Sequence, residues 1–164
     1  VVSDFGRRLL MEELSVSADR LLPHLIETYG ETVERGSLQL HSNKDLGAGI
    51  ASGSHGCDGM VIVPCSMKTL AGVAHGLSRN LAERAADVML KERHPLILVP
   101  RETPMSLPQL RNMVTCAEAG AMVLPAMPAF YQGPKELSDL ADFMAGKILA
   151  ALGLKHNLYP AWKE

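Results

Sequence analysis

Residues 60–72, MVIVPCSMKTLAG, join an apolar run of strand length to a segment of small residues at helical spacing. The run stops abruptly at three polar side chains, Ser66, Lys68 and Thr69. Because an uninterrupted apolar run is typical of a strand buried on both faces, this stretch predicts a buried strand that leads directly into a helix. The polar groups would then lie at the exit of that strand.

The same organisation recurs twice in the second half of the chain. PLILVP at residues 95–100 and AMVLP at residues 121–125 are further apolar runs of strand length. Helical patterns separate and follow the three runs, at residues 69–77, 80–94, 105–120 and 134–153. Alternation of strands and helices implies right-handed crossovers and a parallel sheet, so we predict a doubly wound α/β fold.

The N-terminal part of the chain is less regular. Apolar residues recur at helical intervals over residues 4–14 and 18–29, although Pro23 interrupts the second segment. Residues 30–59 are rich in Gly, Ser and Asn, and they predict a loop with one weak strand near residues 37–40. The chain begins with two valines and no methionine, and we expect that an upstream strand and helix are absent from it.

The composition indicates one globular domain of ordinary size. Of its 164 residues, 47% are hydrophobic and 21% are charged, which argues against disorder. A formal net charge of -2 gives no attraction to nucleic acid or to an acidic membrane, and no apolar run approaches the ~20 residues that span a bilayer. Three cysteines without a CxxC motif and six scattered histidines favour neither disulfides nor a metal site, so we expect a cytoplasmic protein without a metal.

Polar residues follow each of the three apolar runs, in PCSMKT, PRETP and PAMPAFY. In open parallel sheets ligands bind beyond the carboxyl ends of the strands. Ser66 and Thr69, with the backbone N–H groups of the following helix, could hold an anion or a phosphate, or Ser66 could simply cap the helix. Arg101 and Glu102 offer a guanidinium suited to phosphate and a neighbouring carboxylate, or they form a solvated surface pair.

The helical pattern at residues 80–94 also carries charges. Arg84 and Lys91 share one face of this helix, so both could approach one anion. Alternatively, Glu83, Asp87 and Lys91 follow at steps of four and could form a ladder of exposed ion pairs.

Three segments, PCSMKTLAGVAHG, NLAERAADVMLKERHPLILVPRETP and PAMPAFY, together resemble the flavin prenyltransferase (UbiX-type) family, formerly described as aromatic acid or 3-polyprenyl-4-hydroxybenzoate decarboxylases. The likeness extends from residue 1 to about residue 162. It implies a three-layer flavodoxin-like or Rossmann-like fold and a single flavoprotein domain over residues 1–164. The family's first strand and its GASGA-like turn have no counterpart here, so the resemblance also implies truncation at the N-terminus.

The resemblance implies an enzyme that transfers a dimethylallyl group from dimethylallyl monophosphate to reduced FMN, at N5 and then at C6, without a metal. Its product, prenylated FMN, would serve a UbiD-type decarboxylase in ubiquinone biosynthesis or aromatic acid metabolism. Family members commonly form dodecamers, so a homo-oligomer is expected. Two alternatives stay open: a non-catalytic subunit that binds and delivers FMN, and a flavoprotein similar to FMN-dependent cysteine decarboxylases.

The resemblance also assigns roles to single residues of this sequence. FMN contacts are expected from Ser3, Ser66, Met67, Lys68, Thr69 and Arg101. Dimethylallyl phosphate is expected to be held by Arg84, Lys91, Tyr131 and Lys147. Catalytic roles are expected for Glu13, Lys91 and Glu102. Lys147 occupies a position where arginine is also frequent, which keeps the charge but loses the planar fork. With these roles, phosphate binding by Arg84 and Lys91 is favoured over the ladder.

Overall fold

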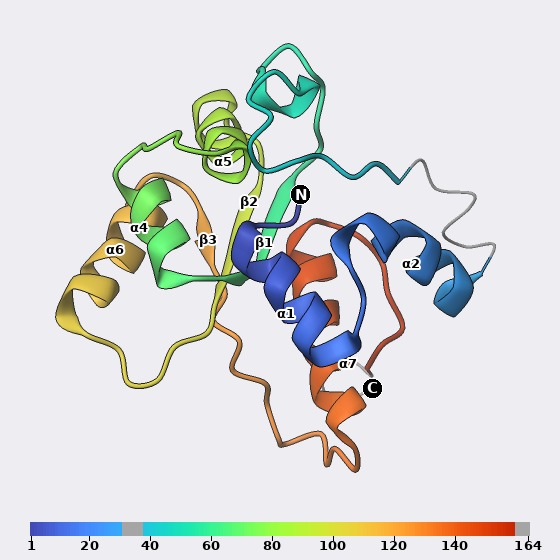
Figure 1. Cartoon of the computed structure of the whole chain (residues 1–164). Coiled ribbons are helices and arrows are strands. Elements are labelled where there is room, and N and C mark those ends of the chain that lie inside the picture. The colour runs from blue at the N-terminus through green and yellow to red at the C-terminus, as the bar shows by residue number, and fades with distance from the viewer. Residues whose placement is uncertain (31–37, 160–164) are drawn as a thin grey trace.

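A parallel sheet of three strands forms the centre of the protein. The computed structural model describes residues 1–30 and 38–159. Its strands are β1 (Met60–Cys65), β2 (Leu96–Pro100) and β3 (Met122–Val123), in the order β1-β2-β3. Met60 pairs with Leu96 and Ile97 pairs with Met122, so all three strands run in the same direction (Figure 1). The predicted parallel α/β organisation is confirmed.

Helices cover both sides of this sheet. The second half of the chain contributes α4 (Met67–Ala74), α5 (Leu81–Glu92), α6 (Leu107–Glu118) and α7 (Leu137–Ala151). The first half contributes α1 (Asp4–Leu14), η1 (Ala18–Arg20), α2 (Leu21–Tyr29) and η2 (Gly49–Ala51). Figure 1 shows α4, α5 and α6 on one side of the strands, with α1 and α7 on the other. The fold therefore has three layers, as predicted.

The core lies between the sheet and the layer formed by α4, α5 and α6. Its buried members are Cys65, Leu70, Val73, Ala86, Val88, Met89, Leu96, Leu98, Cys116 and Ala121. These residues come from the apolar runs and from the inner faces of the three helices. Burial of such side chains contributes about 1.5–3 kcal/mol each for the larger ones, which fixes these helices against the sheet.

The burial of the outer strands differs from the prediction. Every residue of β2 is buried, as expected for a continuous apolar run. In contrast, Val63 of β1 is 58% exposed and Met122 of β3 is 48% exposed. The prediction of strands buried on both faces is therefore wrong for β1 and β3. Both are the outer strands of the described sheet, whereas β2 has a neighbour on each side.

Two predictions for the N-terminal part need correction. The segment expected as one helix over residues 18–29 is a 3₁₀ turn, η1, followed by α2. Pro23 lies in the first turn of α2, where a missing N–H removes no helical hydrogen bond. The weak strand expected near residues 37–40 is not a strand at residues 38–40, and residue 37 lies outside the described range. Instead, Ser42 forms an isolated parallel bridge with Val2.

None of the helices in the described residues combines the length and the apolar character needed to cross a membrane.

Candidate functional site

The exits of the three strands meet at one edge of the sheet. Cys65, the last residue of β1, is paired with Pro100, the last residue of β2. Beyond β3, the Ala126 N–H donates to the Pro100 carbonyl at 2.9 Å. The segments that begin at Ser66 and Arg101 and the segment around Ala126 therefore leave the sheet side by side. The convergence of polar segments that the sequence predicted is present.

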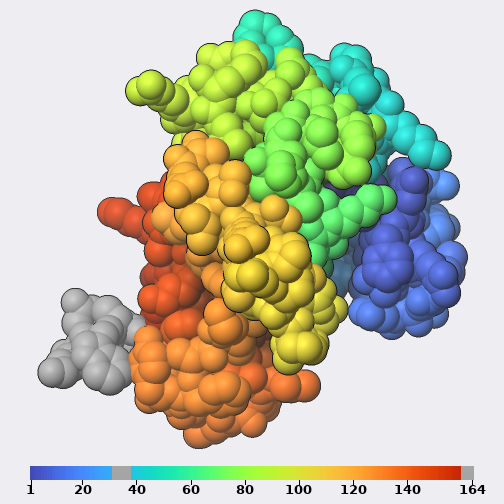
Figure 2. Space-filling model, turned by 90° about the vertical axis from the view of Figure 1, so that its left-hand side faces the viewer, coloured from blue at the N-terminus to red at the C-terminus, as the bar shows by residue number. Residues whose placement is uncertain are grey.

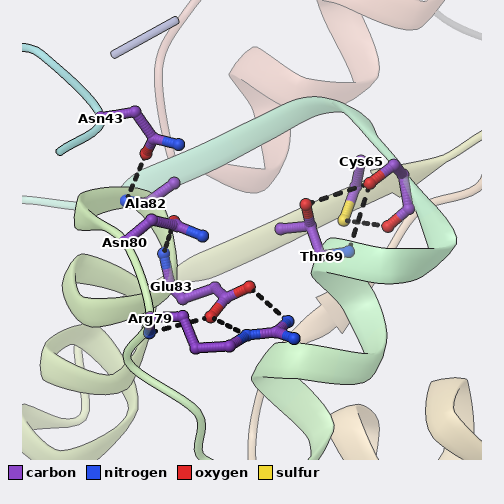
Figure 3. Close-up of polar contacts among 8 residues, drawn as sticks. Asn43, Cys65, Thr69, Arg79, Asn80, Ala82 and Glu83 are labelled. Atoms are coloured by element: carbon purple, nitrogen blue, oxygen red, sulfur yellow. Dashed lines mark hydrogen bonds and ion pairs between the residues drawn. The ribbon is translucent and has the colours of Figure 1, made fainter. Parts of the chain in front are cut away.

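The Ser66 segment starts helix α4. Ser66 is the N-cap of α4, and its Oγ accepts a hydrogen bond from the Thr69 N–H at 3.2 Å. The two hydroxyl oxygens of Ser66 and Thr69 lie 3.0 Å apart (Figure 3). The capping interpretation is confirmed. Ser66 and Lys68 are exposed, Met67 and Thr69 are half-buried, and the first turn of a helix offers N–H donors and partial positive charge. This segment has the donors that a flavin needs, and its flavin contacts stay a prediction.

A cavity of about 270 Å³ opens between the exits of β2 and β3. It is lined by Pro100, Arg101, Glu102, Thr103, Pro104, Met105, Pro125, Ala126 and Met127. Arg101 is exposed, and Glu102 is half-buried with its Oε1 accepting from the Thr103 N–H at 3.2 Å. The two charged residues predicted at this exit thus line one concave space.

Two of the predicted phosphate-binding residues meet around a buried ring. Phe143 of α7 is 6% exposed, and the Tyr131 ring stands edge-on to it, with the ring centroids 6.2 Å apart. Lys147 Nζ lies 5.4 Å from the Phe143 centroid and 5.8 Å from that of Tyr159. Cation–π attraction of this kind orients the ammonium group. Sequence reasoning missed Phe143 and Tyr159, although the spacing of four between Phe143 and Lys147 places both on one face of a helix.

Arg84 and Lys91 lie on α5 and face a different segment. Arg84 Nε donates to the Ala51 carbonyl at 3.0 Å, and Arg84 Nη1 forms an ion pair with Asp87 Oδ2 at 2.8 Å. Lys91 pairs with Glu92, and a Cβ built on Gly53 would lie 3.0 Å from Lys91 Nζ. Both cations therefore flank the segment of residues 51–53.

The prediction of an exposed ladder of ion pairs along α5 is wrong. Glu83 is buried and pairs with Arg79, which precedes the helix, while Asp87 pairs with Arg84. The third member, Lys91, pairs with its neighbour Glu92. Each residue of the expected ladder thus pairs with a residue outside the ladder.

The predicted phosphate-binding residues form two separate pairs within one chain. Arg84 and Lys91 belong to α5, whereas Tyr131 and Lys147 belong to the region of α7. Figure 1 shows α5 on one side of the strands and α7 on the other, and Figure 2 shows the yellow-green segment of α5 above the orange segment in which α7 begins. One copy of the chain therefore does not bring all four side chains to a single phosphate group.

The remaining predicted residues lie on α1. Ser3 is the N-cap of this helix, and its Oγ accepts from the Gly6 N–H at 3.0 Å. Glu13 is exposed near the other end of the helix. Figure 1 places α1 on the side of the sheet opposite α5, so the chain does not bring Glu13 and Lys91 together.

No group of three or more His, Cys, Asp or Glu side chains suited to a metal ion occurs in residues 1–30 and 38–159. The three cysteines are free thiols. Burial, and in second place the nearby Cys116, raises the pKa of the Cys65 thiol to about 12, and burial raises that of Cys116 to about 11. Neither thiol is ionised at neutral pH, so neither has the character of a nucleophile.

Comparison with known proteins identifies the family. The model of the family described as Flavoprotein matches residues 24–149. A flavin prenyltransferase UbiX from Halalkalibacterium halodurans is 45% identical over 164 residues, which cover 100% of this chain and 79% of the relative. The chain belongs to the flavin prenyltransferase UbiX family. A UbiX from Methanocaldococcus jannaschii is 38% identical over 149 residues, with 91% of this chain and 81% of the relative covered.

Solved structures of UbiX proteins share the fold. The crystal structure of AnUbiX (PadA1) in complex with FMN and dimethylallyl pyrophosphate is 36% identical, with a TM-score of 0.85 over 99% of this chain and 80% of that chain. A dodecameric FMN-dependent UbiX-like decarboxylase from Escherichia coli O157:H7 gives a TM-score of 0.84 at 36% identity, with 99% and 81% of the two chains covered. The predicted family, enzyme class and flavodoxin-like fold are confirmed.

Proposed function

We propose that this chain transfers a dimethylallyl group from dimethylallyl monophosphate to reduced FMN. The observation that carries the proposal is the pairing of Cys65 with Pro100, because it brings the Ser66 and Arg101 segments to one edge of the sheet, the edge where such folds bind ligands. Membership of the UbiX family supports it, and so does the likeness to a UbiX structure that holds FMN and dimethylallyl pyrophosphate.

The residues at this edge fit a flavin. Hydroxyl groups of Ser66 and Thr69, the N–H groups at the start of α4 and the Arg101 guanidinium are donors suited to phosphate and carbonyl oxygens. Met67 adds apolar surface beside them. We propose that these groups, with Lys68 and Ser3, hold FMN, which when reduced supplies the nucleophilic ring atoms N5 and C6.

The second substrate needs cationic side chains. Cleavage of the allylic C–O bond leaves its electron pair on the departing phosphate, and positive charge develops on the allyl group. Lys147 and the hydroxyl of Tyr131 would hold the phosphate oxygens, as would Arg84 and Lys91. Glu102 and Glu13 are carboxylates suited to stabilise developing positive charge or to move a proton, and we propose these catalytic roles for them. For Lys91 we propose that its ammonium group stabilises the negative charge that develops on the departing phosphate.

Since one chain separates Arg84 and Lys91 from Tyr131 and Lys147, we propose that two copies supply these pairs to one phosphate. The dodecameric state of a similar solved structure supports an assembly in which copies adjoin. The recipient of the product would be a UbiD-type decarboxylase. The cytoplasmic location inferred from the cysteine content stays a prediction.

Incubation of the protein with reduced FMN and either dimethylallyl monophosphate or dimethylallyl pyrophosphate tests the proposal. We expect a prenylated flavin, detected by mass, with the monophosphate as the better donor. Product from the pyrophosphate alone would change the donor but keep the reaction class. Flavin binding without product from either donor would contradict the proposal and favour a protein that only carries flavin.

A further inference from the structure

Glu83 on α5 is 1% exposed, and it is the one charged side chain that is buried within residues 1–30 and 38–159. An isolated buried carboxylate is costly, so its environment must compensate for the lost hydration. Nothing in the proposed reaction uses Glu83, and its side chain points toward Arg79 and α4 (Figure 3). Its presence in the interior therefore needs another explanation.

Arg79 satisfies this carboxylate. The Arg79 backbone N–H and its Nε both donate to Glu83 Oε2 at 3.0 Å, and Arg79 Nη2 donates to Glu83 Oε1 at 2.7 Å. This forked arrangement has the geometry in which an arginine and a carboxylate bind most strongly. Burial raises the pKa of Glu83, but the hydrogen bonds from Arg79 outweigh it and hold that pKa below its usual range.

The pair fits closely against helix α4 at Gly72. A Cβ built on Gly72 would lie 2.8 Å from Glu83 Oε1 and 3.1 Å from Arg79 Nη2. Contacts between carbon and oxygen at such distances are repulsive, so the bare backbone of Gly72 allows α4 to approach the ion pair. A larger side chain at this position would push α4 away from the ion pair.

Helix α5 is anchored independently of this contact. Its inner residues Ala86, Val88 and Met89 belong to the core. Its first turn is held by Asn43, whose carbonyl accepts from the Leu81 N–H at 2.8 Å and whose Oδ1 accepts from the Ala82 N–H at 3.1 Å. Helix α4 is shorter, with eight residues, and carries Ser66 to Thr69 at its start.

We infer that Arg79 and Glu83 form a positioning pair that holds α4 against α5 and thereby places the Ser66–Thr69 segment for flavin binding. The inference rests on the proposed function, because it assigns the flavin to that segment. A displaced helix would misdirect the hydroxyl and N–H donors, and errors of about 1 Å in such groups are sufficient to weaken binding strongly.

Three variants test this inference: Glu83→Gln removes the charge, Gly72→Ala adds a methyl group against the carboxylate, and Arg79→Lys keeps the charge but loses the fork. Glu118→Gln at the exposed end of α6 is the matched control. For Glu83→Gln and Gly72→Ala we expect the FMN dissociation constant to rise about tenfold, with the KM for the dimethylallyl donor at saturating FMN changed less than about twofold. Arg79→Lys should fall between these variants and the parent.

Hydrogen exchange supplies a readout that needs no flavin. Amides of residues 66–74 should exchange faster in Glu83→Gln and Gly72→Ala, whereas amides of residues 81–92 should exchange at the parental rate. If the variants lose thermal stability but keep the parental FMN affinity and α4 exchange, the pair is merely structural and the inference is wrong. A parent that binds FMN without forming product would refute the proposed reaction while leaving this comparison intact. If Glu83→Gln does not fold, Gly72→Ala and Arg79→Lys decide the question.

Discussion

Cys65 and Pro100 end two neighbouring parallel strands and are paired with each other. The residues that follow them, Ser66 and Arg101, therefore leave the sheet at the same edge, one into a helix start and the other into a cavity. Two segments that begin 35 positions apart in the chain thus contribute to one surface.

Replacement of Arg101 with alanine is expected to weaken FMN binding. A hydrogen bond to a charged group contributes about 1.5–3 kcal/mol, so its loss should raise the FMN dissociation constant by roughly tenfold to a hundredfold. Arg101→Lys should recover part of this loss, since it restores the charge without the fork. Fluorescence titration measures the constants. Arg111→Ala, at an exposed position of α6, is the control, and an equal effect at both sites would contradict the prediction.

The two pairs of predicted phosphate ligands give a prediction about assembly. Arg84→Ala and Lys147→Ala should each lower activity with the dimethylallyl donor when assayed alone. If two copies build one site, unfolding and refolding the two variants together should restore about one quarter of the parental activity, because random mixing leaves that share of sites intact. Absence of recovery in refolded mixtures that do exchange subunits would show that one copy supplies all ligands.

Substitution of Lys147 alone separates binding of the donor from binding of the flavin. Lys147→Ala should raise the KM for the dimethylallyl donor and leave the FMN dissociation constant unchanged, because Lys147 lies over Phe143 and not at the start of α4. Lys147→Arg should retain a low KM, since arginine keeps both the charge and the contact with an aromatic face. Lys155→Ala, at an exposed position beyond α7, controls for the general loss of a positive charge.

The sequence predicted the parts of this fold that depend on local pattern. Apolar runs indicated β1, β2 and β3, and the helical periodicities indicated the helices between them, because burial on one face imposes its period on the residues. The convergence of Ser66 and Arg101 could be predicted as well, since it follows from parallel pairing. The exposure of β1 could not be predicted, because it depends on which strands adjoin β1 in the sheet.

The contacts of single charged residues were harder to predict. Steps of four along α5 suggested that Glu83 faces solvent, but periodicity does not report that Gly72 leaves room for its carboxylate. Nor did it indicate that Arg79, outside the helix, would be the partner. Likewise, the family resemblance grouped Arg84 and Lys91 with Tyr131 and Lys147 by function, whereas one chain holds them apart. Such contacts depend on tertiary packing, which residue spacing alone does not contain.

The cysteines are expected to differ in reactivity. Burial, with a smaller contribution from Cys116, raises the pKa of Cys65 to about 12, and burial raises that of Cys116 to about 11, whereas Cys57 is half-buried. The thiolate is the reactive form of a cysteine. At pH about 8 a disulfide reagent should therefore modify Cys57 of the native protein rapidly, and Cys65 and Cys116 slowly. All three should react in denaturant. Rapid modification of either remaining thiol in the native Cys57→Ser variant would contradict this expectation.

The Arg79–Glu83 pair predicts how stability depends on pH. The folded-state pKa of Glu83 is below its usual value, because the hydrogen bonds from Arg79 outweigh the opposing effect of burial. The unfolded chain therefore binds a proton more readily at this site, and the stability contributed by the carboxylate is complete above the unfolded pKa of about 4.3. It is lost as the pH falls through the lower folded pKa.

Denaturant unfolding of the parent and of Glu83→Gln measures this contribution. We expect the parent to have the higher free energy of unfolding by a constant amount from about pH 6 to pH 7, and the difference should shrink as the pH falls from about 5 to 3. Asp139 of α7, whose pKa is lowered by hydrogen bonds from the Lys135 and Glu136 N–H groups, titrates in the same region, but it is present in both proteins and cancels from the difference. A difference that stays constant down to pH about 3 would mean that the charge of Glu83 does not contribute, and that the variant is destabilised by altered packing alone.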